Sequence, residues 1–327
     1  VLYSTRRDAQ IAIVGERELP RILESGLEEE GLDYYSEYLD LARFPDAFHQ
    51  NTLRDFLRLK YSEQRFDVII AMHELALEFL GKNRNDLFPG VPIVFFSSSP
   101  ETQRVPNSAG VVARLNLSGT LTLATELQPD AQQVFVVSDD GRWERRARAQ
   151  FQSFVPRLRI TYLTGLPTKV LEEQLATLPE HSIVYYVIVE RDGLGEHFHP
   201  IDYLDRLTAV ANAPIYSWVD STMDHSIVGG SLKNQKAEMQ AVGKLALRTL
   251  DGEPADAIPV SLVDLNALQV DWRELRRWGI SEARVPSGTL VRFKEPSPWD
   301  RYKLYILGAA AVVLAQTGLI AGLLVQR

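Results

Sequence analysis

The chain is 327 residues long, which is enough for about two domains. Its 45% hydrophobic and 24% charged residues are typical of a globular protein and exclude a disordered or collagen-like chain. The net charge of −8 makes nucleic acid and anionic membrane surfaces poor partners, and the lack of cysteine excludes a disulfide scaffold, a thiolate metal site and a cysteine nucleophile.

Short apolar runs rich in β-forming residues alternate with helical patterns through residues 1–293. We expect strands at Val1–Ser4, Leu32–Leu39, Phe66–Ala71, Pro92–Phe96, Gly110–Arg114, Val134–Val137, Arg159–Leu163, Ile183–Val189, Pro214–Trp218, Ile227–Gly230, Ile258–Leu262 and Thr289–Phe293. We expect helices at Glu18–Glu30, Ala47–Tyr61, Leu117–Leu127, Arg142–Phe154, Thr168–Leu178, Pro200–Ala211 and Leu232–Leu250. Strands that alternate with helices predict an α/β fold with parallel sheets, and so many strands predict two sheets rather than one.

The C-terminal part carries an uncharged apolar segment at residues 304–325. At ~1.5 Å per residue it would be about 33 Å long, so it predicts a transmembrane helix after a short linker at 294–303. Basic residues on both sides leave its orientation open. Gly318 and Gly322 form a GxxxG pattern that favours a homodimer. Because the chain starts with Val1 rather than Met, we expect the native start to lie upstream.

One motif resembles a known family. Residues 252–260 read Gly-Glu-Pro-Ala-Asp-Ala-Ile-Pro-Val and are similar to a segment of the ABC-transporter substrate-binding-like family, which has the type I periplasmic-binding-protein fold. The stretch 109–119, ending Asn-Leu-Ser-Gly, and the stretch 213–216, followed by Val-Gly-Gly at 228–230, resemble other parts of that family. The resemblance covers about residues 1–293 and implies two doubly wound parallel-sheet lobes joined by a hinge.

On this fold, lobe I is expected to hold residues 1–116 and 229–258, and lobe II residues 117–228 and 259–293. Ordinary members of the family lack a C-terminal membrane helix. The combination found here resembles the extracytoplasmic sensor region of a bacterial sensor histidine kinase, with residues 1–303 periplasmic and the helix in the inner membrane. The alternative is a membrane-tethered solute-binding component of an ABC transporter.

Ligands of open α/β sheets bind beyond the carboxyl ends of the strands, so residues that follow strands are the candidates for a small-molecule site between the lobes. These residues are Ser4, Thr5, Met72, His73, Ser97, Ser98, Asn116, Asp139, Glu190, Trp218 and Asp220. Hydroxyl groups and helix N-termini suit an anionic group, acidic side chains suit an ammonium, and an indole supplies an apolar or cation–π wall. Three alternatives stay open: the serines cap a helix, Asp139 belongs to a turn, and His73 is an ordinary core or surface residue.

No pattern marks a catalytic site, a metal or a cofactor. Gly193-Leu-Gly195 lacks the third glycine of a dinucleotide-binding turn, and the pair His197 and His199 has no obvious third metal ligand. We therefore expect a ligand-binding receptor domain without cofactor or metal. An enzyme acting between the lobes stays open as a further alternative.

Overall fold

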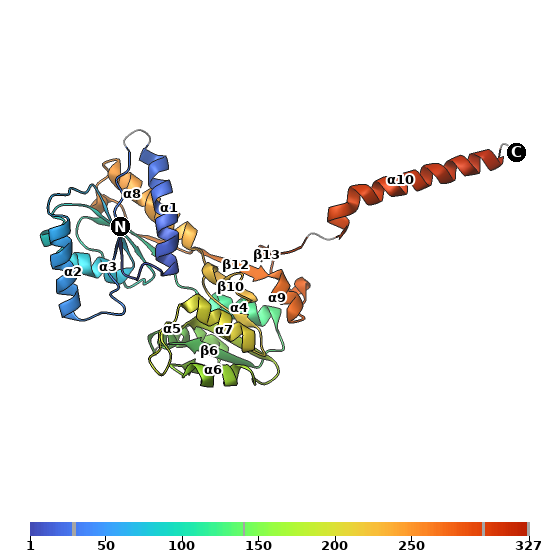
Figure 1. Cartoon of the computed structure of the whole chain (residues 1–327), viewed down its shortest axis with the longest axis horizontal. Coiled ribbons are helices and arrows are strands. Elements are labelled where there is room, and N and C mark those ends of the chain that lie inside the picture. The colour runs from blue at the N-terminus through green and yellow to red at the C-terminus, as the bar shows by residue number, and fades with distance from the viewer. Residues whose placement is uncertain (28–30, 140, 296–297, 326–327) are drawn as a thin grey trace.

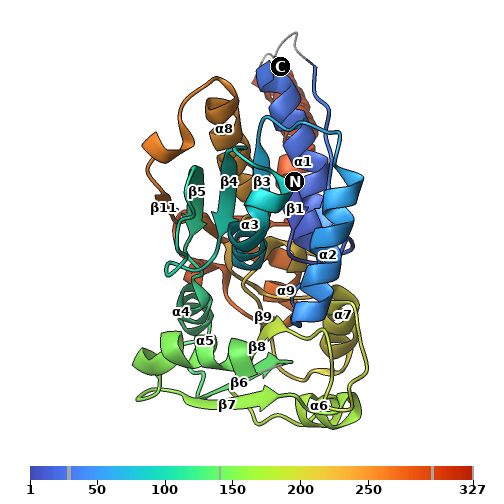
Figure 2. The same cartoon turned by 90° about the vertical axis from the view of Figure 1, so that its left-hand side faces the viewer.

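The computed structural model describes residues 1–27, 31–139, 141–295 and 298–325. Figure 1 shows two α/β lobes, each built on its own sheet, and a long C-terminal helix that projects away from both. We call the lobe built on the sheet that contains β1 lobe I, and the other lobe II. Figure 2 shows lobe I above lobe II.

The sheet of lobe I has the order β11-β5-β4-β3-β1-β2, and all its pairs are parallel. Its strands are β1 (Leu2–Tyr3), β2 (Glu37–Tyr38), β3 (Ile69–Met72), β4 (Ile93–Ser97), β5 (Ser108–Ala113) and β11 (Ser261–Val263). Its helices are α1 (Gln10–Leu27), α2 (Ala47–Lys60), α3 (Glu74–Leu87) and α8 (Gln235–Leu250).

Helices cover both faces of this sheet. In β3, Ile70 and Met72 pack with α1 and α8, whereas Ile69 and Ala71 pack with α2 and α3. Successive side chains of a strand point to opposite faces, so a sheet covered on both sides needs apolar residues at every position. That requirement explains why β3, β4 and β5 are buried throughout.

The sheet of lobe II has the order β13-β12-β10-β9-β8-β6-β7. Its strands are β6 (Gln133–Ser138), β7 (Arg159–Thr164), β8 (Ser182–Ile188), β9 (Ile215–Tyr216), β10 (Gly229–Lys233), β12 (Asn266–Asp271) and β13 (Leu290–Arg292). Its helices are α4 (Leu117–Leu127), α5 (Gly141–Phe151), α6 (Thr168–Leu175), α7 (Pro200–Val210) and α9 (Trp272–Arg277). The short 3₁₀ helices are η1 (Gln152–Phe154), η2 (Asp220–Thr222), η3 (Ala255–Ala257) and η4 (Glu282–Arg284). The β10–β12 pair is antiparallel, and the other pairs are parallel.

The structure differs from the predicted lobe boundaries in two places. β10, predicted in lobe I, pairs with β9 and β12 in lobe II, and β11, predicted in lobe II, pairs with β5 in lobe I. Two glycines explain the first difference. A Cβ on Gly229 would lie 2.1 Å from the carbonyl oxygen of Gln269, and one on Gly230 would lie 1.9 Å from that of Ser217, so β10 fits between its neighbours because it has no side chains there.

The C-terminal helix α10 spans Pro298–Val325 and begins inside the predicted linker at 294–303. Residues 296–297 of that linker lie outside the described residues. No helix among the described residues is long and apolar enough to cross a membrane, so the transmembrane helix predicted at 304–325 is not found. The side chains of residues 304 and 319–325 lie outside the described ones.

Candidate functional site

Lys233, the last residue of β10, is a buried cation at the junction of the lobes. Its Nζ lies 3.1 Å from Oε1 of Glu238 on α8 and donates a 3.2 Å hydrogen bond to Oγ of Ser98, which follows β4. Its Nζ also lies 5.1 Å from the ring centroid of Phe96. A side chain from the sheet of lobe II is therefore held by three groups of lobe I.

The carboxyl group of Glu238 lies inside the protein, with none of the residue's surface exposed. Burial raises its pKa to about 7, although the charge and the hydrogen bond of Lys233 act to lower it. Neither carboxylate oxygen has a hydrogen bond of good geometry among the described residues, so Lys233 holds Glu238 mainly through charge. Substituting only one member of this ion pair should destabilise the fold more than substituting both, because a single buried charge without its partner is strongly unfavourable.

His73 lies next to this pair, at the start of α3. Its backbone has φ 72° and ψ 163°, a conformation that is essentially restricted to glycine. The ring packs edge-on against Phe96, with 5.5 Å between the ring centroids. Burial lowers the pKa of His73 to about 4, with further lowering by the positive charge of Lys233, so the ring is neutral at pH 7. Strain of this kind clusters at binding sites and switches, where the surrounding structure holds it in place.

The strain at His73 gives a first testable prediction. His73→Gly and His73→Ala lose the same ring contacts, but only glycine adopts this backbone conformation without strain. We expect His73→Gly to be more stable than His73→Ala by about 1–2 kcal/mol in urea denaturation. Equal stability of the two variants would show that the backbone at residue 73 is unstrained.

A direct ion pair joins the lobes beside His73. Nη2 of Arg146 on α5 lies 3.7 Å from Oε1 of Glu74, the first residue of α3. The Arg146 guanidinium lies 5.1 Å from the ring centroid of Trp143, which in turn lies 5.1 Å from that of Trp218. One cation, one anion and a half-buried indole therefore meet where α3 and α5 begin.

Three of the predicted site residues belong to this junction. His73 and Ser98 contribute as described above. Oδ2 of Asp220 accepts a 3.1 Å hydrogen bond from the backbone N–H of Gln235 and thereby contacts the first residue of α8. Burial raises the pKa of Asp220.

Two predicted residues lie in the hydrophobic cores instead. Met72 is fully buried in lobe I among side chains of its sheet and of α1 and α8. Trp218 is buried in lobe II, where its Nε1 donates a 2.6 Å hydrogen bond to the carbonyl oxygen of Val187. Both side chains end up in a core because they face a covering helix rather than the neighbouring lobe.

Three further predicted residues hold local backbone in place. Oγ of Ser97 accepts a 3.0 Å hydrogen bond from the backbone N–H of Ser99. The side chain of Asn116 caps α4 by accepting a 2.9 Å hydrogen bond from the backbone N–H of Gly119. Oδ2 of Asp139 accepts a 3.0 Å hydrogen bond from the backbone N–H of Glu190, which ties the ends of β6 and β8 together.

Ser4, Thr5 and Glu190 lie at strand ends, and the carboxylate of Glu190 acts electrostatically on Arg43 of lobe I. Ser4 is buried, and its backbone extends the pairing beside Met72. The Thr5 hydroxyl is buried and has no hydrogen-bond partner among the described residues. The ligand-binding role of the eleven residues stays a prediction.

A cavity of about 450 Å³ opens between the lobes beside Asp220. Its walls are formed by α1 and the start of α8 from lobe I, and by η2, β12 and β13 from lobe II. The lining residues are Gln10, Val14, Arg17, Asp220, Ser221, Met223, Asn234, Gln235, Lys236, Gln269, Arg292 and Phe293. Its volume lies in the range of small-molecule pockets, about 300–1,000 Å³. Because its walls come from both lobes, its size depends on how the lobes sit against each other.

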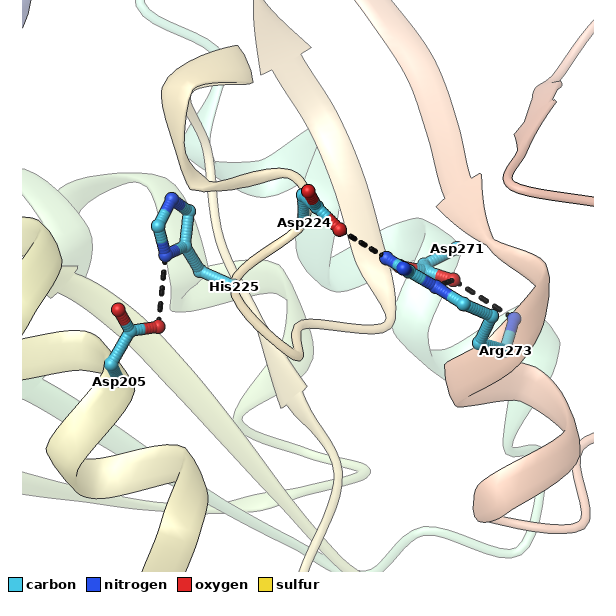
Figure 3. A network of polar contacts seen from close by, with 5 residues as sticks. All are labelled: Asp205, Asp224, His225, Asp271 and Arg273. Atoms are coloured by element: carbon cyan, nitrogen blue, oxygen red, sulfur yellow. Dashed lines mark hydrogen bonds and ion pairs between the residues drawn. The ribbon is translucent and has the colours of Figure 1, made fainter.

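A polar network fixes the loop that joins η2, which contains Asp220, to β10 (Figure 3). Nη2 of Arg273 lies 2.6 Å from Oδ2 of the buried Asp271 and 2.6 Å from Oδ1 of Asp224. In the same loop, Nδ1 of His225 lies 2.8 Å from Oδ1 of Asp205 on α7. The loop between η2 and β10 is thus tied to α9 on one side and to α7 on the other.

Sequence reasoning missed four residues of the junction: Glu74, Arg146, Lys233 and Glu238. Arg146 belongs to an arginine-rich stretch that is typical of a solvated helix face, and Lys233 ends a strand that begins with two glycines. Burial of a charge next to an opposite charge depends on which sheets the segments join, and no local pattern reports it. Among the described residues, no group of three or more His, Asp and Glu side chains could hold a metal ion.

Comparisons with known proteins identify the fold. No protein-family model and no curated protein matches the chain. The solved ABC domain from Streptococcus pneumonia in complex with L-Trp has a TM-score of 0.63 at 13% identity and covers 89% of this chain and 98% of its own. The ligand-free, open structure of CD0873, a substrate binding protein with adhesive properties from Clostridium difficile, has a TM-score of 0.64 at 13% identity. The match covers 90% of this chain and 98% of CD0873.

A sugar-binding protein of a sugar ABC transporter from Bacillus halodurans is also similar, with a TM-score of 0.54 at 14% identity, covering 81% of this chain and 94% of its own. At these identities the likeness concerns the fold alone. The two α/β lobes with parallel-rich sheets match those of type I periplasmic-binding-protein-like proteins.

Proposed function

We propose that this protein binds a small polar molecule between its two lobes. The observation that carries the proposal is the ion pair between Glu74 of lobe I and Arg146 of lobe II, formed next to the strained and neutral His73. A cation and an anion that pair across two lobes can each turn to the opposite charge of a ligand without leaving a charge unpaired. The similar solved proteins, which include ligand-binding proteins of ABC transporters, support the same function.

The side chains at the junction favour an amino acid as the ligand. Glu74 suits an ammonium group, Arg146 suits a carboxylate, and Trp143 offers an aromatic wall beside Arg146. A neutral sugar offers hydroxyl groups but no charge to Glu74 or Arg146, so it would gain less than an amino acid from separating this ion pair. L-Trp is the molecule bound in one of the similar structures, and it is therefore the first probe to use.

Arg146→Ala tests this assignment. We expect isothermal titration of L-tryptophan to give a dissociation constant that is about 10–100-fold higher for Arg146→Ala than for the wild type, because a hydrogen bond to a charged group contributes about 1.5–3 kcal/mol. The matched control is Arg148→Ala on the same helix, since Arg148 pairs with Glu144 inside lobe II.

The control variant should bind like the wild type. An equal loss in both variants would point to a general change in α5 rather than to a lost contact. Binding of D-xylose but not of L-tryptophan would contradict the ligand class, and binding of L-tryptophan that is unchanged in Arg146→Ala would contradict the site.

For the whole protein we propose an extracytoplasmic ligand-sensing domain of a membrane receptor, as in a sensor histidine kinase. Supporting this reading, α10 follows β13 of lobe II after a short segment, so a movement of lobe II against lobe I would displace the start of the helix. The membrane helix at 304–325 and the periplasmic location of residues 1–303 belong to this proposal. The solute-binding component of an ABC transporter fits the similar structures as well.

The coding sequence after Arg327 separates the two readings. A histidine-containing dimerisation helix and an ATP-binding domain would support the receptor. A stop codon beside genes for a permease and an ATPase would support the transport component. Fusion of a reporter enzyme after residue 327 would then test on which side of the inner membrane that end lies.

A further inference from the structure

The cavity beside Asp220 gathers three cations that the proposed function does not use. Arg17 lies on α1, Lys236 at the start of α8 and Arg292 at the end of β13. Among the described residues that line the cavity, Asp220 is the only carboxylate. In a chain whose net charge is −8, three cations around one cavity favour an anion as the occupant.

Glu18 of α1 holds two of these cations in place. Its Oε1 accepts a 2.8 Å hydrogen bond from Nε of Arg17, and its Oε2 lies 3.7 Å from Nζ of Lys236. The side chains of Arg17 and Lys236 are still 55% and 60% exposed, so each keeps N–H donors for a ligand. Nε of Arg292 donates a 3.0 Å hydrogen bond to Oε1 of the neutral Gln269. Three cations against two carboxylates leave the cavity positively charged.

Gln235 adds a buried acceptor to the wall of the cavity. The residue is 6% exposed, and its backbone N–H donates to Asp220. Its side-chain Oε1 is buried and has no hydrogen-bond partner among the described residues. A buried carbonyl oxygen without a partner is unfavourable, so a donor that enters the cavity gains a hydrogen bond there. The cavity therefore suits an anion that also has a hydroxyl group.

The cavity is separate from the ion pair of Glu74 and Arg146. Neither of these residues lines it. Lys233 lies between the two places: its Nζ donates to Ser98 of lobe I, and its backbone N–H donates a 2.8 Å hydrogen bond to the carbonyl oxygen of Trp218, just before η2. A ligand in the cavity would therefore contact other residues than the amino acid proposed above.

We propose that this cavity is a second ligand site and binds a small hydroxylated polycarboxylate. Its carboxylates would pair with Arg17 and Lys236 of lobe I and with Arg292 of lobe II, while its hydroxyl group would donate to Oε1 of Gln235. Several carboxylates on one carbon skeleton suit cations that come from three elements, whereas inorganic phosphate concentrates its charge at one point. Because Arg292 ends β13, a bound anion would also hold β13, which precedes α10, against lobe I.

Isothermal titration of the full chain with citrate, at fixed ionic strength, tests the site. Citrate carries several carboxylates and a hydroxyl group. We expect Lys236→Gln to raise the citrate dissociation constant about tenfold, because it removes a charged donor. The matched control is Lys244→Gln, since Lys244 lies on the same helix, is also exposed and loses the same charge, but does not line the cavity. A wild type that does not bind citrate, tighter binding of inorganic phosphate than of citrate, or an equal effect of the two substitutions would overturn the proposal.

Tricarballylate tests the role of Gln235, because it differs from citrate only in lacking the hydroxyl group. We expect the wild type to bind it about fivefold more weakly than citrate. Gln235→Leu removes the buried acceptor and should abolish this difference, so that the variant binds both molecules alike. A variant that keeps the difference would overturn the proposed contact between the hydroxyl group and Gln235.

Arg146→Ala separates this proposal from the proposed function. Arg146 lies outside the cavity, so we expect the variant to bind citrate like the wild type, whatever its effect on L-tryptophan. Loss of citrate binding in Arg146→Ala would place citrate at the ion pair with Glu74 and overturn the second site. Failure of L-tryptophan to bind while citrate binds would overturn only the proposed function.

Discussion

Lys233→Met is expected to lower the free energy of unfolding by about 3–5 kcal/mol at pH 8, because it leaves the Glu238 carboxylate buried without its cation. Methionine has a similar volume, but it loses the ammonium above the Phe96 ring and the hydrogen bond to Ser98. The loss of stability therefore combines these contacts with the cost of the unpaired carboxylate, and its pH dependence isolates the carboxylate. Urea denaturation followed by circular dichroism measures the change.

The effect of Lys233→Met depends on pH with a defined sign. The pKa of Glu238 is about 7 in the folded protein, compared with an ordinary value of 4.5. The folded protein therefore binds the carboxyl proton more tightly than the unfolded chain does. For this reason the free energy of unfolding falls as the pH rises from about 4.5 to about 7. Lys233 lowers this pKa, and its removal raises the pKa further. The variant is therefore less destabilised at pH 5, where Glu238 is protonated, than at pH 8.

A double variant provides the control. Lys233→Met/Glu238→Leu removes both charges, and we expect it to recover most of the stability that Lys233→Met loses, because a buried ion pair replaced by apolar residues is often neutral or stabilising. The same loss at pH 5 and pH 8, or no recovery in the double variant, would mean that Glu238 is not the group left unpaired.

Asp271→Ala is expected to lower the free energy of unfolding by about 2–4 kcal/mol (Figure 3). The side chain is buried and caps α9 by accepting a 2.8 Å hydrogen bond from the backbone N–H of Arg273. It also accepts a 2.6 Å hydrogen bond from Nη2 of the same arginine. The variant loses the cap and the charged hydrogen bond together.

Asp224→Ala is the matched control, because Asp224 binds the same guanidinium at the same 2.6 Å distance but has a side chain that is 61% exposed. Water replaces an exposed carboxylate, so we expect a loss below about 1 kcal/mol. The difference between the two variants in urea denaturation isolates the effect of burial. Equal losses of unfolding free energy in the two variants would show that burial of Asp271 does not strengthen its interaction with Arg273.

Much of the fold could be predicted from local pattern. The helix at Leu117–Leu127 has the predicted bounds, and Ala47–Lys60 differs from prediction by one residue. The strand at Asn266–Asp271 was outside the predicted set because its sequence, Asn-Ala-Leu-Gln-Val-Asp, has one β-branched residue and no strict alternation of polar and apolar side chains. The order of strands in each sheet is a long-range property, and for this reason the placement of β10 and β11 could not be read from their own residues.

The candidate site was harder to predict than the fold. The rule that sites follow strands selects His73, Ser98 and Asp220, which do lie where the lobes meet. The same rule selects Met72 and Trp218, whose side chains point into the cores. The direction of a side chain at a strand end depends on the pleat and on the last few backbone angles, and a prediction of strand boundaries from sequence does not fix these angles.

The assembly of lobe I from separate parts of the chain sets the order in which it can form during synthesis. Its sheet receives β1 to β5 early, but Met239, Val242 and Leu245 of α8 complete one of its cores, and β11 completes its edge. Until α8 has left the ribosome, the apolar side chains that it covers are unprotected, and the edge at β5 stays open until residue 263 has followed. A fragment such as residues 1–116 would therefore expose the apolar side chains that α8 covers in the full chain, and exposed surface of this kind makes an incompletely folded chain prone to aggregation.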